Sequence, residues 1–314
     1  MKNVVVIGGG HGLSVIVRGL KQLGNIRLSA VVTVADDGGS TGRLRAQYHI
    51  PAMGDIRNVM CAMAESETLL STLMNYRFEG ASNDVGGHNL GNLLLTALTQ
   101  NCGSFIEAIQ SFSKVMNVKG DIIPSSSEVI TLYAVMEDGT IVRGESNIPD
   151  FNNRISRVFY QGDVQATAQA VAAIHHADII VYGIGSLYTS IMPNLIIRQL
   201  RDELAQSSAK KIYFCNAMTQ PGETDNYSLE DHVQAILDHT QANAVDVVVF
   251  HNNEIAPSIM EKYQEMGASQ VYIRDEHHPY QILKRDMLQF ENDLIRHDAN
   301  KVRDVMEEII NSKD

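Results

Sequence analysis

The chain opens with a strand, a glycine turn and a helix pattern in direct succession, and this unit constrains the fold more than any other feature. Asn3–Ile7 is a valine-rich run that leads into four glycines among the five residues Gly8–Gly12. An apolar pattern at helical spacing begins after Ser14. Apolar runs without alternation are typical of parallel strands covered on both faces. The opening therefore predicts a βα unit with a glycine turn at the carboxyl end of its strand.

The same kind of unit recurs along the chain. Four more short runs rich in Val and Ile have strand character, namely Leu28–Ala35, Ile179–Tyr182, Lys211–Cys215 and Val245–Phe250. Helical periodicity is clear after Asp55 and over residues 90–99, 164–175, 192–204 and 231–239. Alternating strands and helices predict an α/β fold that is Rossmann-like and doubly wound, with a mainly parallel sheet.

The middle of the chain has a different pattern. Ile130–Met136 and Thr140–Glu145 flank Glu137–Gly139, which is a hairpin signal. We interpret residues 121–158 as a small antiparallel segment, either an insertion or an edge of the main sheet. Because no repeat or long linker interrupts the chain, we expect residues 1–314 to form a single domain that contains this inserted segment.

Composition excludes several classes of function. The 37 acidic residues outnumber the 25 basic ones and the net charge is -12, which argues against a general binder of nucleic acids or membrane surfaces. Cys61, Cys102 and Cys215 form no CxxC pair, so we expect neither a disulfide framework nor a thiolate metal site. Without a signal peptide or a long apolar stretch, the sequence predicts a cytoplasmic protein that does not insert into membranes.

The opening loop differs from two well-known phosphate-binding patterns. In a dinucleotide fingerprint the third glycine would stand at Leu13, and no Gly-Lys-Ser/Thr follows as in a Walker A loop. The first difference disfavours an NAD-dependent oxidoreductase. A glycine turn that leads into a helix still offers backbone amides to an anion. We expect a phosphate at Gly9, Gly10, His11 and Gly12, the alternative being a tight turn without a ligand.

The loop after the second predicted strand combines acidic, glycine and basic residues. Asp36 and Asp37 precede a glycine turn, and Mg²⁺ is commonly held by one or two carboxylates together with a substrate phosphate. Asp55, in a later Gly-Asp-Ile-Arg-Asn segment, is a third candidate, although it could instead cap the helix that follows. We therefore treat Asp36, Asp37 and Asp55 as candidate Mg²⁺ ligands. Candidate ligand contacts in this region are Gly38, Gly39, Ser40, Arg43, Arg45 and Asn58.

Three later loops repeat the combination of glycine and hydrogen-bonding side chains. They are Gly86–Asn92, Gly183–Ser190 and Cys215–Thr224. The second and third of these loops each follow a predicted strand, whereas the first does not. We therefore expect the second and third loops, with the two earlier glycine loops, to meet at the sheet edge where such folds bind ligands. The candidate ligand contacts in these loops are His88, Asn89, Asn92, Gly185, Ser186, Tyr188, Asn216, Thr219 and Gln220.

Taken in order, these blocks resemble the family that joins YvcK-like gluconeogenesis factors with 2-phospho-L-lactate transferase (CofD-like, UPF0052). The blocks are GGGHGLS, VADDGGSTGRLR, GDIRN, GGHNLGNLL, GIGSLYTSIMPNL and CNAMTQPGET. The late blocks are nearer the YvcK-like branch. Two positions depart from the family pattern: His11 stands where threonine is usual, and Ile184 where proline is usual. The bulk of His11 leaves the shape of that loop's ligand open.

The resemblance implies a Rossmann-like core and two possible functions. The YvcK-like branch is similar to proteins that bind UDP-sugars such as UDP-N-acetylglucosamine and is associated with gluconeogenic growth, cell shape and cell-wall synthesis. We expect a regulatory binding protein of this kind, with a nucleotide sugar as ligand and homo-oligomers possible. The transferase branch implies the alternative, a Mg²⁺-dependent phosphotransferase that moves a phospholactyl group onto a deazaflavin alcohol.

In the first case the diphosphate would bind at the glycine loops and at Arg43 or Arg45, with His88 and Asn89 near the sugar. Tyr188 or Tyr263 could stack on uracil, although both could equally be packing residues. Arg296 is a late candidate whose alternative is a solvated charge on a helix.

Overall fold

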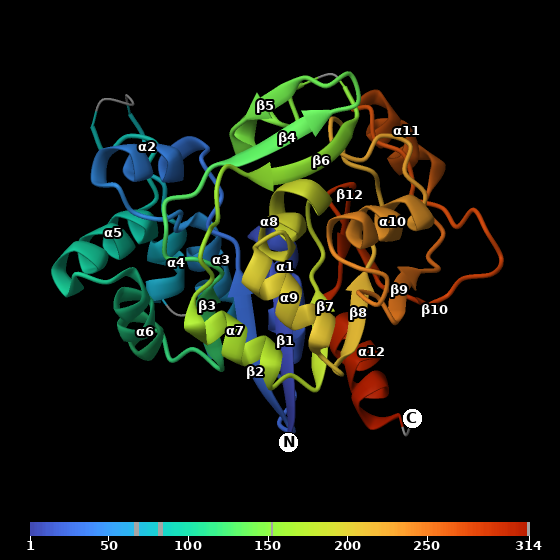
Figure 1. Ribbon diagram of the computed structural model, residues 1–314, viewed down its shortest axis with the longest axis horizontal. Coiled ribbons are helices and arrows are strands. Elements are labelled where there is room, and N and C mark those ends of the chain that lie inside the picture. Colours follow the sequence, from blue (N-terminus) through green and yellow to red (C-terminus); the bar gives the residue numbers. More distant parts are fainter. Residues whose placement is uncertain (66–68, 81–83, 152, 313–314) are drawn as a thin grey trace.

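The computed structural model describes residues 1–65, 69–80, 84–151 and 153–312. Its core is a seven-stranded sheet in the order β10-β9-β8-β7-β1-β2-β3, and every neighbouring pair is parallel (Figure 1). The strands are β1 (Lys2–Gly8), β2 (Ile26–Val32), β3 (Asp121–Pro124), β7 (Ile179–Tyr182), β8 (Lys210–Phe214), β9 (Val247–His251) and β10 (Gln281–Arg285). This confirms the Rossmann-like, doubly wound and mainly parallel fold.

The five predicted strands are the central ones, β1, β2, β7, β8 and β9. Their side chains are almost all buried, which explains the uninterrupted apolar runs in the sequence. The two edge strands were not predicted. β10 carries exposed Gln281 and Lys284, and β3 is a four-residue strand that starts with an exposed aspartate. Part of the 121–158 segment, namely β3, therefore belongs to the main sheet.

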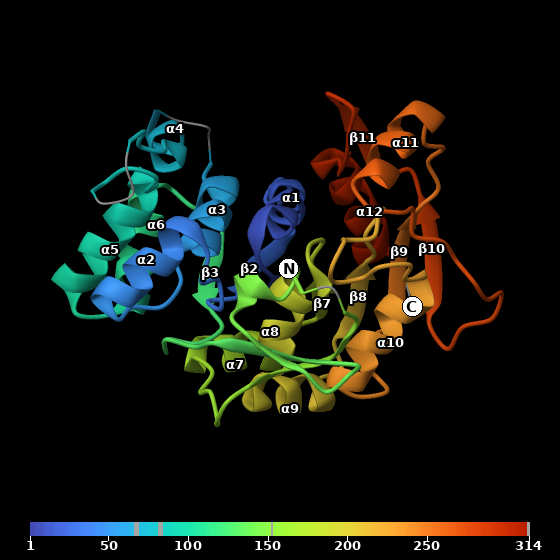
Figure 2. The same cartoon turned by 90° about the horizontal axis from the view of Figure 1, so that it is seen from above.

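Helices pack on both faces of the sheet, and a further group lies beyond the β3 edge. In Figure 2, α1, α3 and α12 lie on one face, and α7, α8, α9 and α10 lie on the other. The helices are α1 (Gly10–Leu20), α2 (Gly39–Tyr48), α3 (Gly54–Met63), α4 (Leu69–Asn75), α5 (Leu90–Cys102), α6 (Phe105–Val115), α7 (Ala168–His175), α8 (Met192–Leu195), α9 (Arg198–Gln206), α10 (Leu229–His239), α11 (Pro257–Glu265) and α12 (Ala299–Asn311). Among the described residues, no helix combines the length and the apolar character needed to cross a bilayer.

The helix expected over residues 192–204 is divided. It comprises α8 and α9, and a single π-helical turn, η2 (Leu187–Ile191), precedes α8. Residues 36–45 also differ from the expected loop, because α2 begins at Gly39 and carries both Arg43 and Arg45.

A three-stranded antiparallel sheet stands above the carboxyl ends of the main strands (Figure 1). It has the order β5-β4-β6 and consists of β4 (Leu132–Met136), β5 (Ile141–Arg143) and β6 (Ile155–Tyr160). The predicted hairpin is confirmed as β4 and β5. Between β5 and β6 a short 3₁₀ helix, η1 (Glu145–Asn147), turns back toward the main sheet. A separate hairpin, β11 (Leu288–Glu291) with β12 (Leu294–His297), precedes α12.

The order in which strands are added to the sheet reverses between β1 and β7, because β2 and β3 lie on one side of β1 and β7 to β10 lie on the other. Ligands of doubly wound sheets bind outside such a switch point, at the carboxyl ends of the strands. Here the first turn of α1 touches the loop after β7. A Cβ on Gly12 would lie 2.0 Å from the carbonyl oxygen of Ile184 and 2.8 Å from the amide nitrogen of Gly185. Glycine at position 12 thus permits the two loops to meet at the switch point.

We predict that Gly12→Ala destabilises the protein by about 1–3 kcal/mol, the usual cost of overpacking. The added methyl group would displace backbone atoms of the β7 loop. Gly24→Ala is the matched control, because a Cβ there meets nothing within 4 Å. Urea denaturation of both variants measures the difference, and equal unfolding midpoints would contradict the proposed close contact.

Candidate functional site at the carboxyl edge of the sheet

The glycine loop after β1 holds its backbone against a carboxylate. Gly10 has φ = 64°, a left-handed conformation that favours glycine. The Asp55 carboxylate accepts a hydrogen bond from the amide of Gly10, and a Cβ on Gly9 would lie 2.4 Å from Asp55 Oδ2. The N-cap of α3 is Met53, so the alternative interpretation of Asp55 as N-cap is wrong. Asp55 instead faces the start of α1.

Four helices begin around this loop without a side-chain cap. The N-cap residues of α1, α2, α3 and α5 are Gly9, Gly38, Met53 and Asn89, and none of them accepts a hydrogen bond through its side chain. Side chains cap α6, α7, α10 and α12, whereas α8, α9 and α11 also begin without a side-chain cap. The first-turn amides of a helix need an acceptor and carry partial positive charge. The uncapped ends thus form a concentration of anion-binding backbone.

Contacts join the four uncapped ends into one site. Gly9 and Asp55 connect α1 with α3, as described above. A Cβ on Gly54 would lie 2.7 Å from Thr41 Oγ1 and 2.9 Å from Asp36 Oδ2, which brings α3 against α2. The start of α5 reaches α2 through Ser40, whose hydroxyl accepts from the amide of Asn89 at 3.4 Å.

Three partly buried carboxyl groups lie close together in this site. Burial and the nearby Asp36 carboxylate raise the pKa of Asp55 to about 7. Burial and the carboxylates of Asp36 and Asp55 raise the pKa of Glu145 to about 8. Burial also raises the pKa of Asp36, against hydrogen bonds from the Gly38 amide and Thr41. The group holds more negative charge than the protein surroundings stabilise.

Sequence reasoning missed Glu145. It lies on η1, more than a hundred residues from Asp36, and reaches the site only because the antiparallel sheet folds over the edge (Figure 1). Nothing in its local sequence marks it as a site residue.

Asp37 attaches the antiparallel sheet to the loop between β2 and α2. Its Oδ2 accepts from the amide of Glu145 at 3.2 Å and its Oδ1 from the amide of Ser146 at 3.0 Å. Both carboxylate oxygens are thereby used by backbone donors. The structure therefore places Asp37 as a positioning residue for Glu145, whereas the sequence had suggested a metal ligand.

A polar network follows from α2 to α3 and α5. Ser40 Oγ lies 2.9 Å from His88 Nδ1 and accepts from Asn92 Nδ2 at 3.1 Å. Arg57 donates to Asn92 Oδ1 at 2.9 Å and to Asn58 Oδ1 at 2.6 Å. Arg57 is buried, and its Nε has no hydrogen-bond partner among the described residues. This network brings the histidine loop, which was not expected at the sheet edge, against the second glycine loop.

Positive charge gathers around His11. The side chain is exposed on the first turn of α1, and its pKa is lowered by partial burial and then by the charges of Arg57, Arg296 and Arg18. Arg296 is an exposed charge, as its alternative interpretation expected, but it lies on strand β12 and not on a helix. In the described structure, the side chains of Arg18 and Arg296 have no hydrogen-bond or ion-pair partner. Arg18 and Arg296 therefore bring positive charge without a protein partner to the vicinity of His11, next to the carboxyl groups of the site.

Arg43 and Arg45 already contact backbone carbonyls. Arg43 donates to Gly86 O at 2.9 Å. Arg45 is buried and donates to the carbonyls of Ala35 and Asp36, at 3.1 and 2.6 Å, and to that of Ile130. Arg45 thus joins the second glycine loop to the segment before β4. Gly38 and Gly39 lie at the start of α2, where Gly39 has φ = 46°.

The loops after β7 and β8 are bound to each other. Asn216 Nδ2 donates to Gly185 O at 2.8 Å, and Gly185 N donates to Asn216 Oδ1 at 3.3 Å. Ser186 Oγ and Gln220 Nε2 donate to Glu223 Oε1, at 2.6 and 2.7 Å. Glu223 is buried and also accepts from Thr189, so it fixes the β7 loop from the β8 loop.

Three expected contacts lie away from the surface of the site. Tyr188 is 2% exposed, and its hydroxyl lies 2.9 Å from that of Tyr227, so its ring is part of the core. Thr219 is buried and pairs with Ser269. The hydroxyl of Tyr263 accepts from the amide of Ile295 and positions β12. The structure therefore gives all three packing or positioning roles.

The described residues contain no preformed metal cage, because no group of three or more His, Cys, Asp or Glu side chains among them is arranged to hold an ion. Mg²⁺ more often takes one or two carboxylates and completes its shell with water and phosphate. Asp36 and Asp55 fit that pattern, because the Asp36 carboxylate is close enough to raise the pKa of Asp55 and both lie beside uncapped helix starts.

Comparison with known proteins identifies relatives along nearly the whole chain. The family described as 2-phospho-L-lactate transferase CofD matches residues 4–288. The gluconeogenesis factor of Halalkalibacterium halodurans is 46% identical over 316 residues, which cover 97% of this chain and 95% of that protein. The gluconeogenesis factor of Bacillus subtilis is 41% identical, with 98% of both chains covered. A crystal structure of a UPF0052 family member from Bacillus halodurans superposes with a TM-score of 0.93 at 45% identity, covering 97% of this chain and 99% of that one.

We predict that Asp55 makes the folded protein less stable as the pH rises. Its pKa is about 7 in the folded state against 3.8 ordinarily, so the folded state binds more protons between these values. The free energy of unfolding should therefore fall as the pH increases from about 4 to 7, and Asp55→Asn should reduce that fall. At pH 8 without divalent cations the variant should be more stable, by at most about 4 kcal/mol.

Chemical denaturation across this pH range, in the presence of a chelator, measures the effect. Asp84→Asn is the control, because Asp84 is exposed on the surface. A variant that unfolds with the same pH profile as the parent chain would show that Asp55 is not desolvated in the folded protein.

Proposed function

Because this chain belongs to the CofD family, we propose that its carboxyl-edge site binds a nucleotide sugar of the UDP-N-acetylglucosamine type. The observation that carries the proposal is the convergence of four uncapped helix starts with buried Arg57 and with Arg296, which lies near His11, in a protein of net charge -12. Backbone amides and arginines are the groups that recognise a diphosphate. In an acidic chain, this local positive field favours a phosphorylated small molecule over a nucleic acid.

The site has distinct regions for the parts of such a ligand. The diphosphate would lie at the start of α1, between the glycine loop and Arg296. The network of Ser40, His88 and Asn92 offers donors and acceptors without net charge, as sugar hydroxyls require. The antiparallel sheet would cover the bound ligand as an inserted part of a single domain.

The relatives are named gluconeogenesis factors, and we extend that role to this chain. On this proposal it is a cytoplasmic regulatory protein whose ligand-bound state links nucleotide-sugar supply to carbon metabolism, cell shape and cell-wall synthesis. Binding, not turnover, would be its activity.

We predict that UDP-N-acetylglucosamine stabilises the protein against unfolding. At a free ligand concentration 100 times the Kd, the added free energy is about 2.7 kcal/mol. Arg296→Ala should weaken binding about tenfold or more, because a charge-assisted contact to phosphate is lost. Thermal denaturation and calorimetric titration with UDP-sugars, ADP-glucose and free UDP measure both effects.

Lys284→Ala removes an exposed positive charge from the far edge strand and serves as the control. Two results would show that the proposed ligand is wrong. One is an unfolding midpoint that no nucleotide sugar moves while deazaflavin phosphates do. The other is equal affinity of the parent chain and Arg296→Ala.

The cluster of partly buried carboxyl groups supports a second candidate, a Mg²⁺-dependent phosphotransferase. Asp36 and Asp55 would hold the ion with a substrate phosphate, and Mg²⁺ would neutralise charge that develops on the transferred group. Glu145 lies beside them with a pKa of about 8, so it could donate or accept a proton near neutral pH.

On this alternative, we predict that the protein transfers a phospholactyl group from a nucleoside diphosphate-activated donor to a deazaflavin alcohol. Turnover, followed by phosphorus NMR, should require Mg²⁺ and fall about 100-fold or more in Asp36→Asn, with Asp84→Asn unchanged. If UDP-N-acetylglucosamine binds and no donor is consumed with Mg²⁺ present, the transferase alternative is excluded.

A further inference from the structure

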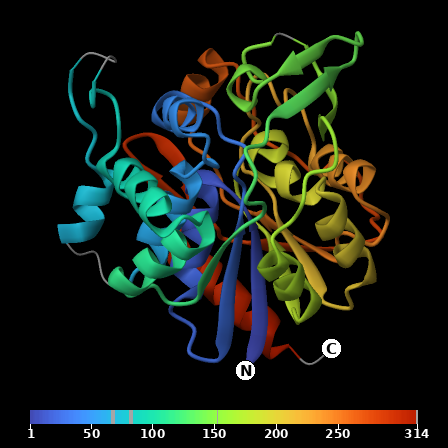
Figure 3. The ribbon, with the colours of Figure 1, turned by 60° about the vertical axis from the view of Figure 1, so that its left-hand side comes forward.

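A second cavity lies at the β3 side of the main sheet, away from the carboxyl-edge site. We name it the α6–α7 groove, because these two helices form its walls and strands β1, β2 and β3 form its floor. Figure 3 shows the blue strands β1 and β2 between the green α6 and the yellow-green α7. Its volume is about 1010 Å³, at the upper end of the roughly 300–1,000 Å³ typical of ligand pockets. Asn3, at the far end of the groove, is six residues before Gly9, so along β1 it lies about 20 Å from the glycine loop.

The floor of the groove is polar where such a sheet is normally apolar. Asn3 is in register with Arg27 on the neighbouring strand, and Ser29 is in register with Asp121 on the next. All four line the groove, whereas the residues that alternate with them on β2, such as Leu28, belong to the hydrophobic core. Parallel strands are usually apolar on both faces because helices cover both. This row of polar residues therefore indicates a face adapted to something other than a packed helix.

Positive charge in the groove lacks protein partners. Arg27 on β2 and Lys114 on α6 are both exposed, and within the described residues neither side chain forms a hydrogen bond or an ion pair. Asp121 is the one carboxylate of the lining, so the charged lining residues sum to a net charge of about +1. On an acidic protein, two cations without partners in one cavity mark a position for an anion.

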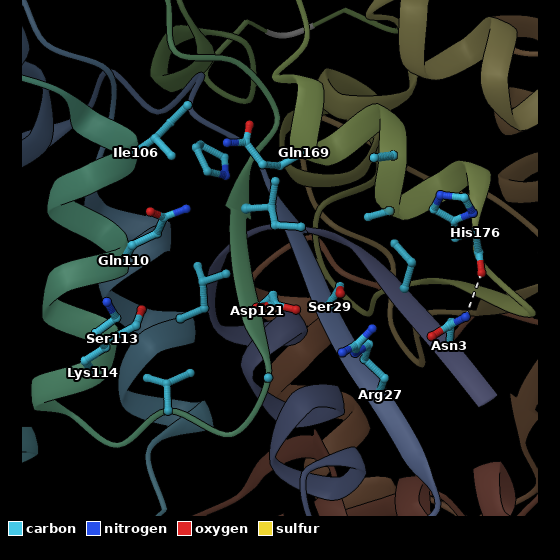
Figure 4. A pocket seen from close by; sticks show the side chains of 18 of the residues that line it. Asn3, Arg27, Ser29, Ile106, Gln110, Ser113, Lys114, Asp121, Gln169 and His176 are labelled. Carbon is cyan, nitrogen blue, oxygen red and sulfur yellow. Dashed lines mark hydrogen bonds between the residues drawn. The ribbon is translucent and has the colours of Figure 1, made fainter. Parts of the chain in front are cut away.

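A buried hydroxyl and an apolar strip complete the lining. Ser113 Oγ, on the α6 wall, is buried and has no hydrogen-bond partner among the described residues. Figure 4 shows Ser113 and Lys114 on α6, with Arg27, Ser29 and Asp121 on the strands of the floor. Ala172 and Ala173 of α7, together with Ile106 and Ile123, add apolar surface to the same cavity.

We propose that the α6–α7 groove is a second ligand site, which binds a small amphipathic monoanion such as a medium-chain carboxylic acid. Arg27 binds the anionic head group from the floor, and Lys114 adds positive charge from the α6 wall. The apolar body lies along Ala172, Ala173 and Ile123. Because the lining carries a net charge of +1, we expect the groove to favour a ligand with one negative charge over a ligand with two or three. The site is independent of the nucleotide-sugar site, since it shares no residue with it.

Fluorescence titration with 8-anilinonaphthalene-1-sulfonate, an aromatic monoanion, tests the proposal on the full chain. The dye should bind the parent protein and be displaced by octanoate, but not by octylamine at the same concentration. Arg27→Ala combined with Lys114→Ala should weaken dye and octanoate binding about tenfold or more, because charge-assisted contacts are lost. Ala172→Phe, which fills the groove without changing charge, should do the same.

Lys284→Ala is the control and should bind the dye as the parent chain does. Thermal unfolding of each variant verifies that it is folded. Dye affinity that is unchanged in both groove variants, or equal displacement by octylamine, would overturn the proposal. So would a dimer in sedimentation experiments that Ala172→Phe dissociates, because the groove would then be an interface between two copies of this chain.

Discussion

Asp36, Asp55 and Glu145 lie together in one partly buried site, and the electrostatic cost of bringing these three carboxyl groups together constrains the surrounding structure. Like charges in a medium of low dielectric repel strongly, and burial disfavours each charged form. The fold offsets this cost with donors, since Gly10 and Gly38 give amides to Asp55 and Asp36. Helix starts without side-chain caps add positive potential at the same edge. The raised pKa values of Asp55 and Glu145 show that the compensation is incomplete.

The antiparallel sheet brings one of the three carboxyl groups to the site, and residues of the site hold this sheet in place. Asp37 accepts two amide hydrogen bonds from η1 and thereby carries Glu145 to the other carboxyl groups. Arg45 binds the carbonyl of Ile130, just before β4. On the opposite side, a Cβ on Gly222 would lie 1.8 Å from Pro149 O, so the β8 loop also approaches the segment after η1 closely. Residues from both glycine-rich halves of the edge therefore position the sheet that covers them.

The central strands could be predicted because both of their faces are buried, which leaves an uninterrupted apolar run in the sequence. The edge strands β3 and β10 could not, since exposure permits residues such as Asp121 and Lys284. The site loops were assigned to the correct edge, because the carboxyl ends of parallel strands share one edge by construction. Individual roles were harder to predict. Asp37, Arg45 and Tyr188 have the right residue types for ligand contacts, yet each is used by a protein partner that only the tertiary structure supplies. Glu145 is the opposite case, because its local sequence does not mark it as a site residue. It reaches the other carboxyl groups only because the antiparallel sheet packs over the carboxyl ends of the main strands.

The two candidate ligands of the carboxyl-edge site have opposite linkage to protons. An anion placed at the start of α1, near Asp55, disfavours its charged form further, so a phosphate bound alone raises the pKa of Asp55 and takes up protons near pH 7. A divalent cation favours the charged forms of Asp36, Asp55 and Glu145, so it lowers their pKa values and releases protons. When a phosphate binds together with Mg²⁺, their opposite effects on the pKa values of these carboxyl groups partly cancel. If the site binds a phosphorylated ligand as we propose, these carboxyl groups would make its affinity depend on both pH and divalent cation, although no single side chain is specialised for that coupling.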